Sequence, residues 1–370
     1  MLLKSILILI LVFHAAIAQT LFGTPTFSTS LASQTNLLEK LGVQIVRLLV
    51  SWRQLEENGK SQYQFWYLNS MDKDLEAMSQ MNVKIILQMA QTPCWASTSS
   101  NCSQLYYRPR NYSDYADTMV FLLNRYGDKI SAWEIWNEPN IKRFWLRPEC
   151  QANEGLCPRP ADLNDEWLEF IDLVGAQEYS QLVQITSQKM RTISPNVSIL
   201  AGSLAGSDID YLNAMYQSGI RDFYTGLAMH PYTSYYPNGT SQYGKQYGPD
   251  DCFLSTKASK FWCFQQGVER VREYMIQQME STKSIWFTEF GFSSFAGWDG
   301  AGIQSQADYL GRAIDIIRNQ WPFVHSACVY EYSDYGPADD REGFFGLLYQ
   351  NYTMKPSGVI FQEKMKHFVE

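Results

Sequence analysis

Short apolar runs rich in β-branched residues alternate with longer amphipathic stretches along nearly the whole chain, and no other feature restricts the fold as strongly. Each short run predicts a β-strand, and each longer stretch predicts an α-helix. We expect strands near residues 21–23, 45–50, 83–89, 130–135, 197–201, 225–229, 284–288 and 327–332. We expect helices near residues 31–41, 67–80, 112–126, 174–193, 208–218, 264–281, 302–319 and 357–368.

Eight strands that alternate with eight helices predict a parallel sheet in an α/β fold. A closed (β/α)8 TIM barrel fits this count better than an open sheet. No glycine-rich phosphate-binding fingerprint follows the first strand, which disfavours a dinucleotide-binding fold. The 370 residues, 45% of them hydrophobic, suffice for one large core, and no repeat or linker divides them. We therefore expect residues 19–370 to form a single barrel domain.

The first 18 residues have the features of a signal peptide. Lys4 supplies a basic start, residues 6–13 are apolar, and Ala16-Ile17-Ala18 is a small-residue cleavage site. The apolar run is too short to span a bilayer, and the polar segment 364–370 is unlike a lipid-anchor signal. We therefore expect a protein that is secreted or lies in the endolysosomal lumen. Sequons for N-glycosylation agree with this expectation and begin at Asn101, Asn111, Asn196, Asn238 and Asn351.

The formal net charge is −8, and it becomes −9 when the segment that contains Lys4 is removed. No cluster of Lys and Arg residues interrupts this acidic character. Such a chain is a poor partner for nucleic acid or for an anionic membrane surface. We expect neither partner, and we expect the protein to be a monomer.

Six of the seven cysteines form pairs that lie close in sequence, in polar and turn-rich stretches. In an oxidising compartment these spacings predict three disulfides, although other pairings stay open. The expected pairs are Cys94 with Cys102, Cys150 with Cys157, and Cys252 with Cys263. Each pair falls in a loop that follows a strand. The long loops 139–173 and 233–263 also follow strands and precede helices. Such βα loops form the face on which a barrel carries its active site.

The remaining cysteine, Cys328, lies in an apolar run and is expected to be a buried free thiol. Metal ligation is the alternative for the cysteines as a group. No Cys-x-x-Cys motif and no neighbouring histidine cluster supports it. We therefore expect no metal and no other cofactor.

Two glutamates follow strands in aromatic surroundings. The segment Trp133-Glu-Ile-Trp-Asn-Glu-Pro-Asn140 closes the fourth strand and places Glu138 at its carboxyl end, with Pro139 as the expected stop. The segment Ser284-Ile-Trp-Phe-Thr-Glu-Phe-Gly291 closes the seventh strand and places Glu289 there, with Gly291 expected to let the chain turn away. Glutamates after strands 4 and 7 can face each other across a barrel mouth, which is the arrangement that glycosidic cleavage needs. A single glutamate at a strand end is more often structural, so the hypothesis depends on the pair.

The two motifs resemble those of the clan A glycoside hydrolases, and within that clan the family 39 and family 5 group. The likeness extends over roughly residues 40–356. Further matching segments are Arg47 in the second strand, Thr92-Pro-Cys-Trp95, His230-Pro-Tyr232, Arg341-Glu-Gly-Phe-Phe-Gly-Leu347 and Lys355-Pro356. The resemblance implies a TIM-barrel glycosidase that retains anomeric configuration.

The resemblance also implies roles for these residues. Glu138 is expected to be the acid/base, with a pKa raised by its aromatic surroundings, and Glu289 the nucleophile. Arg47 is expected to lie near Glu289 and to lower its pKa by ion pairing, although a structural interior arginine is the alternative. Asn137 would bond the sugar 2-hydroxyl and Glu289. Tyr232 would donate to the nucleophile and His230 would orient its neighbours.

Aromatic side chains are candidates for sugar-stacking platforms because rings cover the apolar faces of sugars. The candidates are Trp52, Trp95, Trp145, Trp298, Tyr330 and Tyr332, and among them Trp145 and Trp298 are favoured because they lie in βα loops. Two departures from the family pattern concern the sugar site. Tyr330 stands where a strand-8 tryptophan is common, and residues 88–91 lack a common histidine. The acidic residues Glu331, Asp334 and Asp340 either bind hydroxyls or form solvated pairs.

Together these features predict a secreted hydrolase of β-linked poly- or oligosaccharides, with a carbohydrate as its substrate. β-Glucan, xylan, mannan and a microbial exopolysaccharide all stay open, as do endo and exo action. The alternatives are a carbohydrate-binding protein without activity and a transglycosylase. Loss of one glutamate would favour the first alternative, and both glutamates are present.

Overall fold

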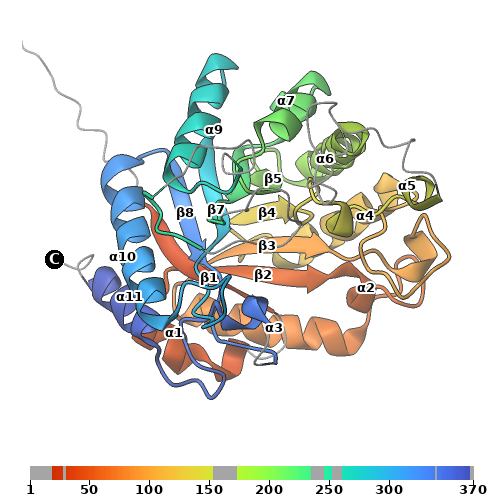
Figure 1. The fold of residues 1–370 in the computed structure, drawn as a ribbon. Helices are drawn as coiled ribbons and strands as arrows, with labels where there is room; N and C mark the ends of the chain where they lie inside the picture. The colour runs from red at the N-terminus through yellow and green to blue at the C-terminus, as the bar shows by residue number, and fades with distance from the viewer. Residues whose placement is uncertain are drawn as a thin grey trace, which may run out of the picture.

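The computed structural model describes residues 19–27, 31–152, 173–234, 246–251, 261–337 and 340–366. Its parallel strands close into a barrel in the order β1-β2-β3-β4-β5-β6-β7-β8. The helices surround these strands, as Figure 1 shows. The expected (β/α)8 barrel is therefore confirmed. The expected signal peptide lies outside the described residues.

The strands agree with the sequence prediction to within a few residues. They are β1 Leu21–Phe27, β2 Ile45–Ser51, β3 Lys84–Ala90, β4 Ala132–Ile135, β5 Ile199–Ala205, β6 Gly226–His230, β7 Ser284–Phe290 and β8 Val324–Val329. Strands β1 and β5 end four residues later than expected, and β8 begins and ends three residues earlier than expected. Tyr330 and Glu331 therefore follow this strand and do not belong to it.

All eight expected helices are present, and the first is divided into a 3-10 turn and an α-helix. The α-helices are α1 Thr35–Leu41, α2 Trp52–Leu55, α3 Phe65–Gln80, α4 Tyr112–Tyr126, α5 Pro148–Ala152, α6 Leu173–Ile193, α7 Ile209–Gln217, α9 Gln265–Gln277, α10 Ile303–Gln320 and α11 Pro356–Lys366. The 3-10 helices are η1 Leu31–Ser33, η2 Cys94–Ala96, η3 Lys142–Phe144, η6 Arg221–Phe223 and η7 Arg341–Phe344. Helices α2 and α5 are short additions within βα loops.

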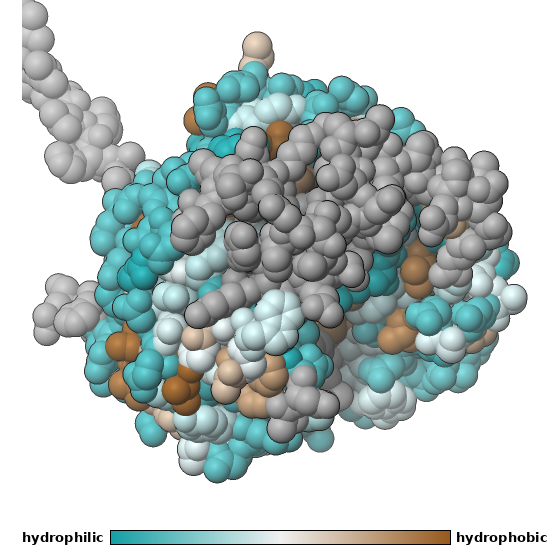
Figure 2. Space-filling model, viewed as in Figure 1, coloured by the Kyte–Doolittle hydropathy of each residue, from teal (hydrophilic) through white to brown (hydrophobic). Residues whose placement is uncertain are grey.

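Helix α4 illustrates how local sequence positions these elements. The side chain of Asn111 accepts a hydrogen bond from the backbone N–H of Ser113 and so caps the first turn. Tyr115, Met119 and Leu122 recur at helical spacing and are fully buried against the barrel. None of the helices in the described ranges is both long and apolar enough to cross a membrane. On the face shown in Figure 2, hydrophilic side chains dominate and hydrophobic ones are scattered.

The interior of the barrel has an apolar layer beneath a polar one. The strands β2 to β8 each contribute one residue to the apolar cluster. These residues are Ile45, Ile86, Ala132, Leu200, Ala228, Trp286 and Cys328. Because side chains alternate along a strand, the residue two positions further points the same way. Within the strands these next positions are Arg47, Gln88, Glu134, Gly202, His230 and Thr288, and Tyr330 follows the end of β8. The period of two therefore places polar groups at the carboxyl-terminal mouth. Cys328 is a buried free cysteine, as expected.

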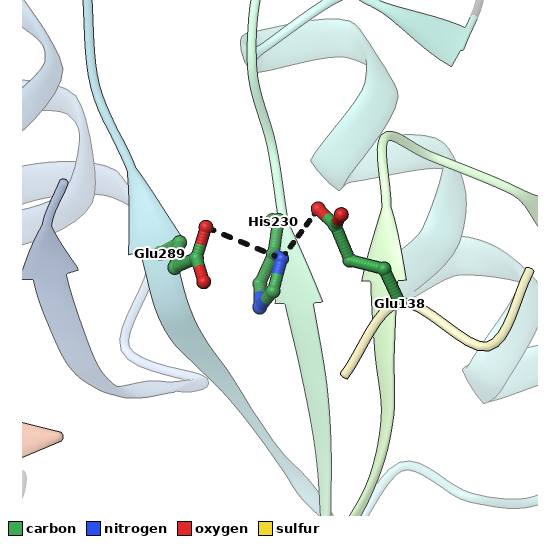
Figure 3. Close-up of side chains that lie close together, drawn as sticks. All are labelled: Glu138, His230 and Glu289. Atoms are coloured by element: carbon green, nitrogen blue, oxygen red, sulfur yellow. Dashed lines mark hydrogen bonds and ion pairs between the residues drawn. The ribbon is translucent and has the colours of Figure 1, made fainter. Parts of the chain in front are cut away.

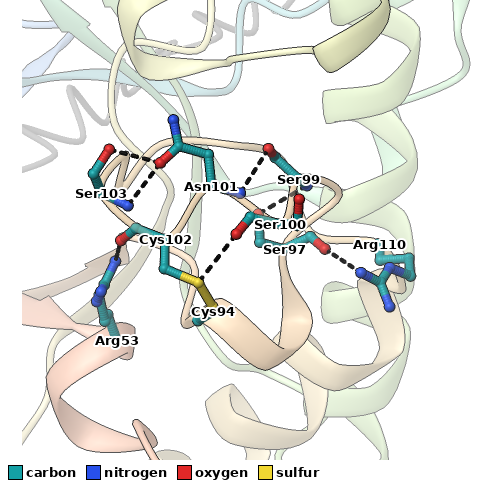
Figure 4. Close-up of a disulfide and its surroundings, with 9 residues drawn as sticks. All are labelled: Arg53, Cys94, Ser97, Ser99, Ser100, Asn101, Cys102, Ser103 and Arg110. Carbon is teal, nitrogen blue, oxygen red and sulfur yellow. Dashed lines mark hydrogen bonds between the residues drawn. A yellow bond between two sulfur atoms is a disulfide. The ribbon is translucent and has the colours of Figure 1, made fainter.

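The loop after β3 is closed by the expected disulfide between Cys94 and Cys102. In Figure 4, Arg53 donates to the carbonyl of Cys102 and Arg110 to that of Ser97, so neighbouring segments hold the closed loop. Cys150 and Cys263 are also disulfide-bonded. Their expected partners, Cys157 and Cys252, lie outside the described residues, and so does Asn238.

Candidate active site

The structure brings Glu138 and Glu289 together at the mouth of the barrel. In Figure 3 the two carboxyl groups point toward one another, with the ring of His230 between them. One side-chain oxygen of each glutamate and one ring nitrogen of His230 all lie within 4.8 Å of one another. Both glutamate side chains are largely buried, and His230 is fully buried. The expected pairing across the barrel is therefore present.

The backbone that carries Glu138 is held in an uncommon conformation. Strand β4 ends at Ile135, as expected, but the backbone change that ends it is at Trp136, which has a left-handed φ of 71°, and not at Pro139. Glu138 is also left-handed, with φ of 41°. Such residues cost about 1–3 kcal/mol each and persist only where the surroundings hold them. Here the N–H of Glu138 donates to Ser203 O at 3.1 Å and turns the carboxyl group toward the mouth.

Glu289 is surrounded by hydrogen-bond donors. Arg47 Nη1 forms an ion pair with Glu289 Oε1, and Tyr232 Oη donates to Oε2 at 2.9 Å. Burial alone would raise the pKa of Glu289. The positive charge of His230 in its protonated form, the charge of Arg47 and the bonds from Tyr232 and Arg47 outweigh burial and hold this pKa below its ordinary value. The Glu289 side chain is therefore a carboxylate at neutral pH, with Arg47 and Tyr232 where the sequence predicted them.

Gly291 has a different role from the one expected. Its φ lies outside the left-handed region, so a sharp turn is not what requires glycine. A Cβ atom at this position would lie 2.2 Å from the backbone oxygen of Tyr330. The absent side chain therefore lets the end of β7 pack directly against the segment that follows β8.

A buried acid that the sequence analysis missed lies beneath Glu289. Glu134 has no exposed surface, and its Oε2 pairs with Arg47 Nε at 2.5 Å. Arg47 Nη2 also donates to Asn137 Oδ1 at 2.9 Å. The guanidinium thus fixes Glu134, Asn137 and Glu289 together, which only a planar, multidentate cation can do. Asn137 was expected to bond Glu289, but its amide oxygen is held by Arg47. Glu134 could have been found as an acid within the apolar alternation of β4.

A chain of hydrogen bonds connects Glu134 to Glu138. Thr288 Oγ1 donates to Glu134 Oε1 at 2.7 Å, and Ser203 Oγ donates to the same oxygen at 2.6 Å. His230 Nε2 lies 3.0 Å from Thr288 Oγ1, and His230 Nδ1 lies 2.8 Å from Glu138 Oε1. Because the Thr288 proton is committed to a carboxylate, its oxygen accepts from His230 Nε2–H. His230 Nδ1 and Glu138 Oε1 therefore share a single proton, which is where a general acid needs it.

The two glutamates open into a pocket of about 1090 Å³, part of which is open to solvent. Arg47, Asn137, Tyr232 and Tyr330 line it as expected. The ring of Tyr330 meets that of Tyr232 edge-on, with centroids 6.3 Å apart. Glu331, which the sequence analysis noted as a possible ligand for hydroxyls, also lines the pocket, as do Glu342 and Phe345 of the segment 341–347. Lining residues that the sequence analysis did not single out include Tyr106, Arg143 and Trp262.

Trp52 and Trp95 do not line this pocket, contrary to expectation. Trp52 has no exposed surface, and its Nε1 donates to Glu56 Oε2 at 2.6 Å. Trp95 Nε1 donates to the backbone oxygen of Glu56 at 2.6 Å, and its ring meets that of Trp52 edge-on. Glu56 therefore turns both indoles into the packed layer beneath the loops, where a buried indole N–H finds its partner.

Trp145, Trp298 and Tyr332 also lie away from the lining of the pocket. Trp145 is buried against Trp136 and donates to Glu178, since the loop after β4 folds back onto α6. Trp298 is 59% exposed on the loop after β7, and Tyr332 is buried beyond the end of β8. Of the six aromatic candidates, the structure thus brings Tyr330 alone to the described pocket. The positions of the other five follow from loop packing, which sequence spacing does not encode.

Glu138, His230 and Glu289 are also close enough together to hold a cation. The surrounding charges disfavour this interpretation. Arg47 places a fixed positive charge against one oxygen of Glu289, and the other oxygen accepts from Tyr232. His230 uses both ring nitrogens in hydrogen bonds to Glu138 and Thr288. We therefore interpret these three residues as acid–base and charged groups of the site, and not as ligands of a metal ion.

With this geometry in place, comparison with known proteins identifies the family. The sequence profile described as cellulase (glycosyl hydrolase family 5) matches residues 15–322. The chain belongs to glycosyl hydrolase family 5. Membership confirms the resemblance to clan A glycoside hydrolases that the two glutamate motifs indicated.

Other similar proteins include a curated β-xylosidase and glycoside hydrolases of known structure. The β-xylosidase of Geobacillus stearothermophilus is 23% identical over 195 residues, which cover 47% of this chain and 33% of that protein. The match thus spans about a third of the length of this relative. A family 39 glycoside hydrolase from Bacteroides cellulosilyticus has a TM-score of 0.65 at 17% identity, covering 95% of this chain and 64% of that one. A β-xylosidase from Caulobacter crescentus has a TM-score of 0.64 at 18% identity, covering 93% and 67%. At such identities these structures show a shared fold.

Proposed function

We propose that the protein is a secreted, retaining glycosidase that cleaves β-linked poly- or oligosaccharides by double displacement. The observation that carries this proposal is the separation of Glu138 and Glu289, whose nearest ligand oxygens lie within 4.8 Å. Retaining glycosidases hold their carboxyl groups about 5–5.5 Å apart, whereas inverting ones need about 6.5–9.5 Å to admit water between them. The close pair supports direct attack by one glutamate.

In the first step the Glu289 carboxylate attacks the anomeric carbon and the bond to the leaving oxygen breaks. Glu138 gives the proton that it shares with His230 to that oxygen. Arg47 and Tyr232 keep Glu289 ionised and fix its orientation. The product of this step is a glycosyl ester of Glu289 and a free alcohol.

In the second step Glu138, now a carboxylate, takes a proton from water as the water oxygen attacks the same carbon. The ester bond breaks, and Glu289 returns as a carboxylate next to Arg47. Two inversions at one carbon give net retention of configuration. The Glu138–His230 pair loses its single proton in the first step and regains one from water in the second. The pair therefore has the same charge at the end of the cycle as at the start.

The β-linkage and the compartment belong to the same proposal. The names of the Geobacillus and Caulobacter relatives describe β-xylosidases, which supports a β-linked substrate for this chain. Secretion is supported by residues 1–18, and strand β1 begins at Leu21, so removal of that segment leaves the barrel intact. A sugar has polar hydroxyl groups and apolar ring faces. The polar groups and aromatic rings that line the pocket match these two features.

The test is hydrolysis of a panel of β-glucan, xylan, mannan and exopolysaccharide by the secreted protein. Glu138→Gln and Glu289→Gln remove one carboxylate each, and Glu363→Gln, on the exposed side of α11, serves as the matched control. We expect activity on one polymer that falls by about 10³-fold or more in both site variants and stays unchanged in the control. Binding to a polymer without turnover, or activity that survives Glu289→Gln, would contradict the proposal.

A further inference from the structure

Glu331 follows β8 directly and lines the same pocket as Glu138 and Glu289. Its side chain is 95% buried, since only 5% of the residue surface is exposed. Its Oε1 atom nevertheless has no hydrogen-bond partner within the described part of the chain. A buried carboxyl oxygen without a partner costs free energy, so it normally has a function that supplies one.

The surroundings of Glu331 are acidic. Burial acts first, and the charges of Asp334, Glu289 and Glu342 act in the same direction, so the pKa of Glu331 rises to about 10. Lys355 opposes this rise only weakly, because its ammonium group bonds Asp334 at 2.8 Å. The Glu331 side chain is therefore a neutral acid at the pH of secreted or lysosomal fluids. In that form it offers one O–H donor and acceptor oxygens.

No group among the described residues is a hydrogen-bond partner of Glu331 Oε1. Asp334 is satisfied by Lys355 and by the N–H of Gly346, and Asp340 caps the turn η7 by accepting from Glu342 N–H. The backbone of Glu331 is held on both sides, because its N–H donates to Phe345 O and its carbonyl accepts from Leu347 N–H. Of the three acids noted after strand 8, Glu331 is thus the one that faces the pocket with a fixed backbone and a free carboxyl oxygen.

We propose that the Glu331 carboxyl group binds a hydroxyl of the sugar ring that lies next to Glu289, and so helps to select the substrate. This inference rests on the proposed glycosidase function for the identity of the ligand. A hydroxyl matches a neutral acid because each group both donates and accepts one hydrogen bond. An amino sugar would instead require Glu331 to ionise beside three other carboxylates.

The experiment compares Glu331→Gln with Glu331→Ala on the best β-glycoside of the panel. The amide of Gln keeps a donor and an acceptor without charge, so we expect kcat/KM within about threefold of the parent protein. Ala removes both groups, and we expect kcat/KM to fall by about 10–100-fold. Glu363→Ala is the matched control, and thermal unfolding shows whether each variant is folded. Equal impairment of Gln and Ala variants overturns the proposal, because it would mean that a charged carboxylate is required.

A set of monodeoxy glycosides then identifies the hydroxyl. In the parent protein, removal of the bound hydroxyl should lower kcat/KM about as much as Glu331→Ala does, and in that variant the same removal should have little further effect. Additive losses for every hydroxyl would overturn the proposal. If the parent protein hydrolyses nothing, the proposed function fails, and the same comparisons made by calorimetric binding of the glycosides still test Glu331.

Discussion

At the scale of single residues, Arg47 controls the protonation of Glu289, the proposed nucleophile. As pH falls, Glu289 takes up a proton and loses its nucleophilicity, so kcat/KM falls. Because Arg47 and its neighbours hold the pKa of Glu289 below 4.5, the acid limb of the parent protein should have its midpoint below pH 4.5. Arg47→Lys keeps the charge but cannot contact Glu134, Asn137 and Glu289 together.

For Arg47→Lys we expect the acid limb to move to higher pH and kcat/KM at its optimum to fall by about 10²-fold or more. The measurement is the pH profile of kcat/KM between pH 3 and pH 9, with thermal unfolding as the control for folding. An acid limb that stays in place would show that Arg47 does not set the ionisation of Glu289.

Thr288 is a positioning residue that acts on Glu138 through His230. Thr288→Val removes the hydroxyl at nearly constant volume, and Thr288→Ser keeps it as the matched control. Without the hydroxyl, His230 Nε2–H loses its acceptor and the proton on Glu138 is no longer fixed. For Thr288→Val we expect kcat/KM to fall by about 10–100-fold on glycosides with poor leaving groups, which need acid assistance.

The same variant should lose no more than about threefold on a dinitrophenyl glycoside, whose leaving group departs without a proton. Thr288→Ser should stay close to the parent protein on both substrates. If Thr288→Val affects both substrates equally, the hydroxyl supports the fold and not the acid.

At this scale the sequence predicted residues at strand ends and missed two that lie inside strands. Glu138 and Glu289 were found because polar residues follow apolar runs there, and Arg47, inside β2, and His230 were found through the family resemblance. Glu134 and Thr288 lie within β4 and β7, and only the barrel layers show that they point inward. Trp95 was placed wrongly because its hydrogen-bond partner, the carbonyl of Glu56, is remote in sequence. Trp52 was placed wrongly although its partner, the Glu56 side chain, is four residues away.

At the scale of elements, the contact between the end of β7 and the segment after β8 connects catalysis to packing. Gly291 allows the Tyr330 carbonyl to approach, and Tyr330 and Glu331 form one wall of the pocket. Gly291→Ala places a Cβ against that carbonyl and must push the two segments apart. We expect a loss of about 1–3 kcal/mol in the free energy of unfolding, which chemical denaturation measures.

The activity of Gly291→Ala should fall together with its stability, because Glu289 precedes Gly291 by two residues. Gly311→Ala in α10, where the added Cβ lies 3.1 Å from the side chain of Ile360, is a milder control. Unchanged stability of Gly291→Ala would show that the approach is not tight in solution.

The ends of the strands show where local sequence does not determine the structure. Strand β4 ends at Ile135, as the sequence predicts, and Trp136 then turns left-handed. Strand β8 ends at Val329, three residues before the expected end at Tyr332. At β8, tertiary contacts override the strand preference of the sequence. Both strand ends lie at the active site, where strain is commonly kept.

For the whole molecule, the alternation of strands and helices was sufficient to predict a closed barrel. The reason is physical: parallel strands need helical crossovers, and each crossover is long enough to leave a mark in the sequence. The one disulfide with both cysteines in the described residues, Cys94–Cys102, was also predictable from its short separation. The shape of the pocket was not, because its walls come from loops that meet only after the barrel closes.

The central claim is that Glu289 attacks the sugar directly and that configuration is retained. The most direct test is proton NMR of the first product formed from a β-glycoside by the parent protein, recorded before the anomers equilibrate. The account predicts that the β-anomer appears first, and that Glu289→Ala with added azide yields an α-glycosyl azide. An α-anomer as the first product would mean that water attacks directly, and it would contradict the account.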